Sequence, residues 1–133
     1  MHSQLNSFSR EISRYYDSYF EEFGLATSYI ELLLLVESEG GLSQKDLSEK
    51  MNLAPSTITR FIRKLQKEEY VTKSREGRLT KIVISGSAKK RVEKMSELYD
   101  QAGRNLKKLL GEKYVNTTSR LLKHGVDQFG KQD

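Results

Sequence analysis

Residues 43–84 constrain the fold more than any other part of the chain, because they predict two short helices followed at once by a two-stranded ribbon. Ser43 is a suitable N-cap, since its hydroxyl can accept a hydrogen bond from the first turn of a helix. Asp46 stands three residues later, in a partial capping box. The first helix is therefore expected to run from Ser43 to about Met51.

A second helix is expected to begin at Pro55, where the missing N–H of proline costs nothing. Its apolar positions follow the spacing i, i+3, i+4 and i+7 and share one face: Ile58, Phe61, Ile62 and Leu65. The opposite face combines short hydroxyls with long cations, which suits the major groove of DNA. Seven residues are predicted DNA contacts: Pro55, Ser56, Thr57, Thr59, Arg60, Arg63 and Lys64. Either arginine can be the one that reads a base.

After Tyr70 the apolar pattern changes to a period of two, which predicts strands at 71–74 and 80–84 with a turn at Glu76 and Gly77. Four cations lie on this ribbon: Lys73, Arg75, Arg78 and Lys81. One explanation is that charges on an edge ribbon prevent its pairing with another chain and have no further role. Because these cations follow a helix that also has a basic face, we predict instead a second contact with DNA.

The positive charge is regional. The chain has a net charge of +5, but residues 1–53 contain 4 basic and 9 acidic side chains, whereas residues 54–81 contain 8 basic and 3 acidic ones. Residues 82–133 add 11 basic and 6 acidic side chains, which a solvated helix face explains. The basic region therefore coincides with the predicted second helix and ribbon.

Composition limits the other classes. A length of 133 residues suits one domain, no apolar run approaches the roughly 20 residues of a membrane helix, and the N-terminus lacks the order of a secretory signal, so we expect a cytoplasmic protein. The absence of cysteine excludes a thiol switch and a cysteine zinc site. With two histidines, no phosphate loop and no nucleophile beside a base, we predict no enzyme, no metal and no cofactor.

The flanking segments predict amphipathic helices. Residues 1–23 have an apolar and aromatic stripe, formed by Leu5, Phe8, Ile12, Tyr15, Tyr19 and Phe23, and Gly24 is expected to end that helix. The next helix is expected to begin near Thr27 or Ser28, with Glu31 in a capping box with Ser28, and its apolar stretch 30–36 predicts a central position.

Ser87 is expected to cap a long helix whose seam contains Val92, Met95, Tyr99, Ala102, Leu106 and Leu109. Gly111 interrupts it, and the last helix has a further apolar side: Tyr114, Val115, Thr118, Leu121, Leu122, Val126 and Phe129. The two short helices and the ribbon at 43–84 predict a winged helix-turn-helix, and a compact fold of that kind needs only the middle of the chain for its core. The outer helices therefore predict a homodimer, which also matches pseudo-palindromic DNA sites.

The chain resembles the MarR family of bacterial transcriptional regulators over nearly its whole length. Residues 42–51 are LSQKDLSEKM, 55–60 are PSTITR and 65–71 are LQKEEYV, which are similar to the family's LTQKELAEKL, PSTVTR and LEKKGLV. The resemblance implies a mainly α fold with a small β wing, namely a winged helix-turn-helix with dimerisation helices at both ends. It places those helices at 1–23 and 87–133 and the DNA-binding lobe at 27–85, within a single domain 1–133.

The resemblance also implies a function, that of a ligand-responsive repressor acting as an obligate homodimer on double-stranded DNA. Recognition helices are expected in successive major grooves, wings at the flanking minor grooves, and the start of the first helix, at Ser43, Gln44 and Lys45, on the DNA backbone. In the wing, Arg78 matches the family's minor-groove arginine, and Glu76 replaces its orienting aspartate. Lys73 or Lys81 is expected on phosphate.

Two departures from the family carry further expectations. The loop of the wing is a few residues shorter than usual. Where the family often closes the recognition helix with glycine, this chain has Glu69, which predicts a different helix end because a side chain is strained in a left-handed cap.

Aromatic side chains near the expected junction of the lobes can line a pocket for a planar effector: Tyr15, Tyr16, Tyr19, Phe20 and Tyr29. Aromatic stripes at helical spacing more often belong to a core or a dimer interface. The competing function is a winged helix that binds protein rather than DNA, as an interaction module or antirepressor. Salt separates the two, because DNA binding by a basic surface weakens steeply as salt rises.

Overall fold

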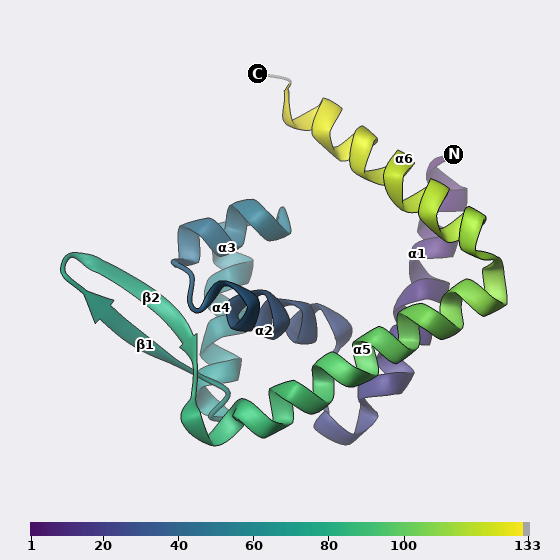
Figure 1. Cartoon of the computed structure of the whole chain (residues 1–133). Coiled ribbons are helices and arrows are strands. Elements are labelled where there is room, and N and C mark those ends of the chain that lie inside the picture. Colours follow the sequence, from purple (N-terminus) through teal and green to yellow (C-terminus); the bar gives the residue numbers. More distant parts are fainter. Residues whose placement is uncertain (132–133) are drawn as a thin grey trace. The chain divides into compact units, whose positions relative to one another are not determined.

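The computed structural model describes residues 1–131, and the last two residues of the predicted dimerisation segment 87–133 lie outside the described residues. Helices dominate, and one two-stranded antiparallel ribbon projects from them (Figure 1). The elements in order are α1 (His2–Asp17), the 3-10 helix η1 (Ser18–Phe23), α2 (Thr27–Glu39), α3 (Gln44–Met51), α4 (Pro55–Lys67), β1 (Val71–Glu76), β2 (Leu79–Ile84), the 3-10 helix η2 (Gly86–Ala88), α5 (Lys89–Leu110) and α6 (Glu112–Gly130). The predicted fold class, mainly α with a small β wing, is confirmed.

By its internal contacts the chain divides into two compact units, Met1–Leu98 and Tyr99–Asp133. The first unit contains every element from α1 to β2 and the beginning of α5. Its core is built from α2, α3, α4, the ribbon and the first turns of α5: Ile30, Leu32, Leu33, Val36, Leu47, Ile58, Ile62, Leu65, Val71, Ile82, Val92 and Met95 are almost completely buried. The nearly continuous apolar stretch of α2 therefore lies at the centre of this unit, as predicted.

α2 begins at Thr27, as predicted, but the capping of its first turn differs from the prediction. Its N-cap is Ala26 and Ser28 lies inside the helix, so the expected capping box with Glu31 does not form. Instead, the Asp17 carboxylate accepts hydrogen bonds from the Thr27 backbone N–H, at 2.8 Å, and from its hydroxyl, at 2.6 Å. A carboxylate at a helix N-terminus satisfies an unpaired N–H and interacts favourably with the helix dipole.

The N-terminal helix changes its winding before it ends. The α-helical part stops at Asp17, residues 18–23 form η1, and Gly24 closes the segment at φ 63°, as expected for that glycine. A 3-10 helix has 3.0 residues per turn instead of 3.6, so side chains after Asp17 shift in phase. As a result Phe20, which is outside the predicted stripe, is completely buried.

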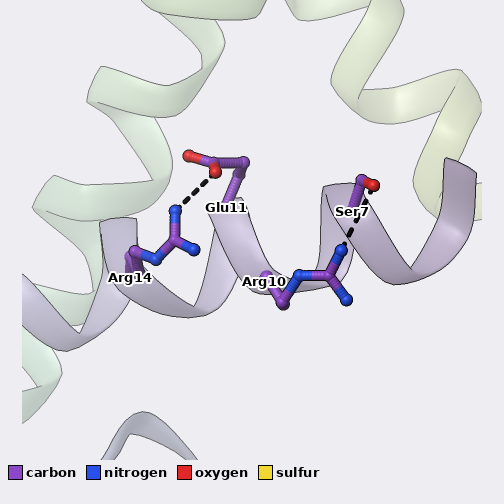
Figure 2. A network of polar contacts seen from close by, with 4 residues as sticks. All are labelled: Ser7, Arg10, Glu11 and Arg14. Carbon is purple, nitrogen blue, oxygen red and sulfur yellow. Dashed lines mark hydrogen bonds and ion pairs between the residues drawn. The ribbon is translucent and has the colours of Figure 1, made fainter.

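The solvent-facing side of α1 has short-range polar pairs. Figure 2 shows Arg14 paired with Glu11, and the Arg10 guanidinium donating to the Ser7 hydroxyl at 3.4 Å. Exposed pairs within one helix contribute only a few tenths of a kcal/mol each. The polar side chains of this side of α1 stay in contact with water. No residue of His2–Asp17 is buried within one chain.

The C-terminal helices are only partly covered. Ser87 does not cap α5 as expected, because it lies inside the η2 turn and α5 begins at Lys89. Four members of the predicted seam are buried, Val92, Met95, Ala102 and Leu106, whereas Leu109 is 70% exposed. Gly111 separates α5 from α6 as predicted, and none of the residues in Glu112–Gly130 is buried. Five apolar side chains of α6 are exposed: Tyr114, Leu121, Leu122, Val126 and Phe129.

The end of α4 contradicts one expectation. Glu69 adopts the left-handed conformation, at φ 63°, that a side chain there was predicted to avoid. The Tyr70 N–H donates to the Leu65 carbonyl at 2.8 Å, and the Glu69 N–H donates to the Gln66 carbonyl at 3.0 Å. These two bonds define a Schellman motif. Because Tyr70 and Leu65 are both buried beside this turn, packing holds the strained backbone in place.

Replacing Glu69 by glycine should therefore stabilise the protein. Glycine adopts a left-handed backbone without steric cost, and we expect a gain of about 1 kcal/mol in the free energy of unfolding, measured with urea. Glu68→Gly is the matched control, since Glu68 has φ −90° and should lose stability on the same change. A destabilised Glu69→Gly variant would show that the side chain contributes more than the strain costs.

Candidate nucleic-acid interface

The two faces of α4 are sharply different. Ile58, Phe61, Ile62 and Leu65 are buried, as the spacing predicted. Among the seven predicted DNA contacts of this helix, Thr57 is half-buried and the other six are exposed: Pro55, Ser56, Thr59, Arg60, Arg63 and Lys64. Since the apolar face is fixed in the core, the hydroxyl and basic side chains lie on the opposite side.

The turn between α3 and α4 follows the sequence closely. The Ser43 hydroxyl accepts from the Asp46 N–H at 3.1 Å, which confirms the predicted cap. Asn52 closes α3 in the left-handed conformation, at φ 53°, and Pro55 occupies the first turn of α4. The Ser48 hydroxyl donates to the Leu53 carbonyl and holds the turn from inside. Together these contacts make a helix-turn-helix.

Gln44 lies at the first position of α3 and contacts α4. Its side-chain amide lies 3.3 Å from the Thr59 hydroxyl, which also donates to the Pro55 carbonyl at 3.0 Å. A hollow of about 380 Å³ lies between the two helices and is lined by Gln44, Lys45, Ser48, Glu49, Pro55 and Thr59. The structure thus brings two of the predicted backbone contacts, Gln44 and Lys45, next to the predicted recognition residue Thr59.

An aromatic stack fixes Lys64, and the sequence did not reveal it. The rings of Tyr29, from α2, and Phe61 are stacked with centroids 4.1 Å apart and an interplanar angle of 22°. The Lys64 ammonium lies 5.1 Å from the centre of the Tyr29 ring, within the range of a cation–π contact. Tyr29 therefore holds a predicted DNA contact in position.

The ribbon is longer than predicted. The strands span Val71–Glu76 and Leu79–Ile84, and the turn falls at Gly77 and Arg78 rather than at Glu76 and Gly77. Gly77 has φ 63°, which explains the glycine there. Arg78 is thus at the tip of the hairpin and exposed.

The register divides the cations of the ribbon between two faces. Lys73 pairs with Ile82, and Arg75 pairs with Thr80, so these side chains share the face of the buried Ile82. Lys81 pairs with Ser74 on the other face, where its ammonium lies 3.6 Å from the Glu76 carboxylate. Lys73 and Lys81 therefore lie on opposite faces of the ribbon and cannot both point toward DNA bound at one face.

A third segment joins the base of the ribbon. The Leu42 N–H donates to the Ile82 carbonyl at 3.0 Å, and the Ile82 N–H donates to the Leu42 carbonyl at 2.7 Å. Gly41 precedes this bridge at φ 124°, and a Cβ there would lie 3.0 Å from Val83 Cγ1. Next to the start of β1, the Arg91 guanidinium of α5 lies 4.3 Å from the centre of the Tyr70 ring. The ribbon is thus tied to the segment before α3 and to α5.

Three of the aromatic residues predicted to line an effector pocket contact one another. Tyr15 packs edge-on against Tyr16 and tilted against Tyr19, with centroids 5.4 Å apart in both pairs, and the Tyr15 and Tyr19 hydroxyls are 3.2 Å apart. Burial, together with the hydrogen bond to Tyr19, raises the pKa of Tyr15 above its usual range. Burial, followed by the nearby Glu31 carboxylate, raises the pKa of Tyr16. Phe20 is completely buried.

No helix between residues 1 and 131 is both long enough and apolar enough to cross a membrane. Over the same residues, no group of three or more histidine or acidic side chains is arranged to hold a metal ion.

The paired helices, the basic face of α4 and the attached ribbon define a winged helix-turn-helix protein with helical extensions on both sides. Residues 27–77, which run from the start of α2 to the turn of the ribbon, match the model of the MarR family. The predicted resemblance to that family is confirmed.

Relatives in sequence and solved structures of similar fold were also found. The chain is 39% identical over 69 residues to the HTH-type transcriptional regulator SarZ of Staphylococcus epidermidis, and 38% identical over 69 residues to SarZ of Staphylococcus aureus. The matches span 51% of this chain and 46% of the SarZ chains, less than half of their length. In fold, the chain is similar to MepR of S. aureus in a DNA complex, with a TM-score of 0.81, 18% identity and coverage of 96% and 97% of the two chains. A mutant MarR from E. coli, complexed with operator DNA, also gives a TM-score of 0.81, with 15% identity and coverage of 92% and 91%.

The close approach at Gly41 leads to a stability prediction. Gly41→Ala should cost about 3 kcal/mol, because the new methyl group meets Val83 and the backbone is strained at φ 124°. Gly40→Ala is the control: Gly40 has φ 70° but open space around it, so only about 1 kcal/mol should be lost. Urea unfolding measures both, and hydrogen exchange should show faster opening at Leu42 and Ile82 in Gly41→Ala alone. Equal losses would mean that the approach of the ribbon to Gly41 adds nothing.

Proposed function

We propose that the protein is a sequence-specific transcriptional regulator that binds double-stranded DNA as a homodimer on a pseudo-palindromic operator. One observation carries the proposal: α4 buries its four core-facing apolar side chains and presents mainly hydroxyl and basic side chains on the opposite side, beside a basic hairpin. An exposed helix of this kind fits the major groove, about 12 Å wide. SarZ relatives are named as transcriptional regulators, and two of the similar folds were solved with DNA, which supports the proposal.

Within α4, the roles follow from side-chain length. Ser56 and Thr57 lie at the N-terminal end, where short side chains let the helix approach the base edges. Arg60 and Arg63 extend further and can donate two parallel hydrogen bonds to a guanine. Lys64, held over Tyr29, is placed to neutralise a phosphate.

The start of α3 supplies a second set of contacts. Its first helix turn presents backbone N–H groups, and Ser43 and Gln44 are half-buried while Lys45 is exposed. In helix-turn-helix proteins the first helix crosses the DNA backbone. A helix N-terminus next to a lysine suits a phosphate, so we assign this end of α3 to the backbone.

The dimer would be built by the terminal helices. In α6 an apolar stripe is exposed along the helix, and across α1 no residue is buried within one chain. Covering such stripes removes apolar area from water, which contributes about 25 cal/mol per Å². A second copy is the simplest cover, because two-fold homodimers are the commonest oligomers and match two-fold DNA sites.

The finer parts of the proposal concern regulation. We infer a cytoplasmic repressor without catalytic activity that responds to a small planar ligand. Such an effector would meet Tyr15, Tyr16 and Tyr19 first, because they are half-buried, whereas Phe20 is completely buried and Tyr29 is stacked on Phe61.

The experiment that tests the proposal is selection of bound duplexes from a random DNA pool by the full chain at moderate salt. Enrichment of an inverted repeat, with half-site centres about one helical turn apart, is the expected result. An unchanged pool would reject the DNA-binding function and favour a winged helix that binds protein instead.

The wing leads to a prediction about two of its residues. Arg78→Ala should weaken binding and also reduce the preference for A·T-rich flanks, because an arginine at a hairpin tip can enter a narrow minor groove. Lys81→Ala should weaken binding to all DNA alike and lower the salt slope by about 1. Affinities on probes that differ only in their flanks measure both effects. Lys73→Ala is the matched control from the opposite face of the ribbon, and if it rather than Lys81→Ala lowers the slope, the other face meets the DNA. Unchanged flank preference in Arg78→Ala would place its side chain outside the groove.

The exposed stripe of α6 leads to a prediction about the oligomer. Val126→Glu places a charge in the stripe and should convert a dimer to monomer, with weaker binding to an inverted repeat. Lys123→Glu, on the same helix but outside the stripe, is the control and should remain dimeric. Sedimentation equilibrium of the full chain measures the mass of each variant.

The N-terminal helix leads to a separate prediction. Deletion of residues 1–20 should give aggregates or poorly folded monomer. A well-folded, monomeric, DNA-competent truncation would contradict the assignment.

A further inference from the structure

The hydroxyl of Thr59 is occupied inside the protein although the residue is exposed. Its Oγ1 lies 3.0 Å from the Pro55 carbonyl, one turn earlier in α4, and 3.3 Å from the Gln44 side-chain oxygen of α3. A hydroxyl has one proton, so it cannot fully donate to both oxygens. The hydrogen bonds of Thr59 are all satisfied if the Gln44 amide is turned by about 180°, because its nitrogen, rather than its oxygen, then lies next to the Thr59 hydroxyl. Thr59 then donates to Pro55 and accepts from Gln44.

This arrangement decides what Thr59 can offer to DNA. With its proton directed to the Pro55 carbonyl, the hydroxyl has no donor left for a base acceptor such as O4 of thymine or O6 of guanine. Because Oγ1 takes the staggered position that faces the helix backbone, the methyl group Cγ2 takes a position that projects away from it. Thr59 therefore presents a methyl group on this face, near the Pro55 ring.

The surroundings of Thr59 favour an uncharged, apolar group. Thr59 and the Pro55 ring line the hollow of about 380 Å³ between α3 and α4. Lys45 and Glu49 line the same hollow, and their opposite charges leave it without net charge. The major groove presents one methyl group of its own, at C5 of thymine, which threonine methyl groups contact in direct readout.

We propose that Thr59 is a specificity-determining residue that selects a thymine in each half-site through its methyl group, held in that orientation by Pro55 and Gln44. This rests on the proposed DNA-binding function and adds the identity of one base. The preference comes from burial of a methyl group, which corresponds to about a fourfold change in affinity per half-site.

The test compares thymine with deoxyuridine, which differs only by the missing 5-methyl group. Each thymine of the selected duplex is replaced in turn, in both half-sites, and the affinity of the full chain is measured. Wild-type protein should lose affinity about fourfold per half-site at the position that Thr59 contacts. Thr59→Ser keeps the hydroxyl but lacks the methyl, so it should bind thymine and deoxyuridine there equally. Thr59→Val keeps the methyl and should retain the discrimination.

Each outcome has a definite meaning. Wild-type binding that is indifferent to every replacement would overturn the inference while leaving the DNA-binding function intact. Discrimination that survives unchanged in Thr59→Ser would overturn it as well, because another residue would then contact the methyl group. Failure of the wild-type chain to enrich any duplex would reject the proposed function itself. Since Thr59 is exposed, both variants should unfold at the wild-type urea midpoint, which confirms that any change is local.

Discussion

Burial of four apolar side chains of α4 fixes the rotation of this helix, and the rotation in turn orients the hydroxyl and basic side chains on the opposite face. Ile58, Phe61, Ile62 and Leu65 are buried, and α4 packs against α3 and β1 and, through the stack of Phe61 on Tyr29, against α2. Burial of each such side chain contributes about 1.5 to 3 kcal/mol, far more than any surface ion pair in the molecule. Rotation of α4 would expose these groups, so the basic and hydroxyl side chains are held outward by the core rather than by contacts among themselves.

Contacts at both ends of α4 fix the neighbouring segments relative to this helix. At the N-terminal end, Pro55 and the turn from α3 place Gln44 beside Thr59. At the C-terminal end, the Schellman turn at Glu69 leads directly into β1, and Tyr70 lies under the Arg91 guanidinium. The bridge between Leu42 and Ile82 then ties β2 to the segment before α3. α4 and the ribbon are therefore parts of one connected framework.

Local signals made α3, the turn and α4 predictable from the sequence, because Ser43, Pro55 and the spacing from Ile58 to Leu65 act within a few residues. Contacts between distant segments were not predictable. The Asp17 carboxylate binds the start of α2 from ten residues away, and Tyr29 stacks on Phe61 across the core. The lack of a side chain at Gly41 leaves room for Val83 of the ribbon, a contact that forms only in the folded chain. Glu69 was wrongly expected to avoid a left-handed backbone, since propensity ignores the packing of Tyr70 that holds it there. The positions of the candidate site residues on α4 followed from periodicity, whereas the division of the wing cations between two faces required the strand register.

The salt dependence of DNA affinity tests the central claim most directly. If the basic face of α4, the start of α3 and the ribbon contact phosphates in both copies of a dimer, binding should release about six or more counterions. Affinity for the selected duplex should then fall about a thousandfold or more between about 50 and about 200 mM salt, along a straight line in a double-logarithmic plot. An affinity that hardly changes over this range would contradict the account, because binding would then depend on an apolar protein surface rather than on the charges of α4 and the wing.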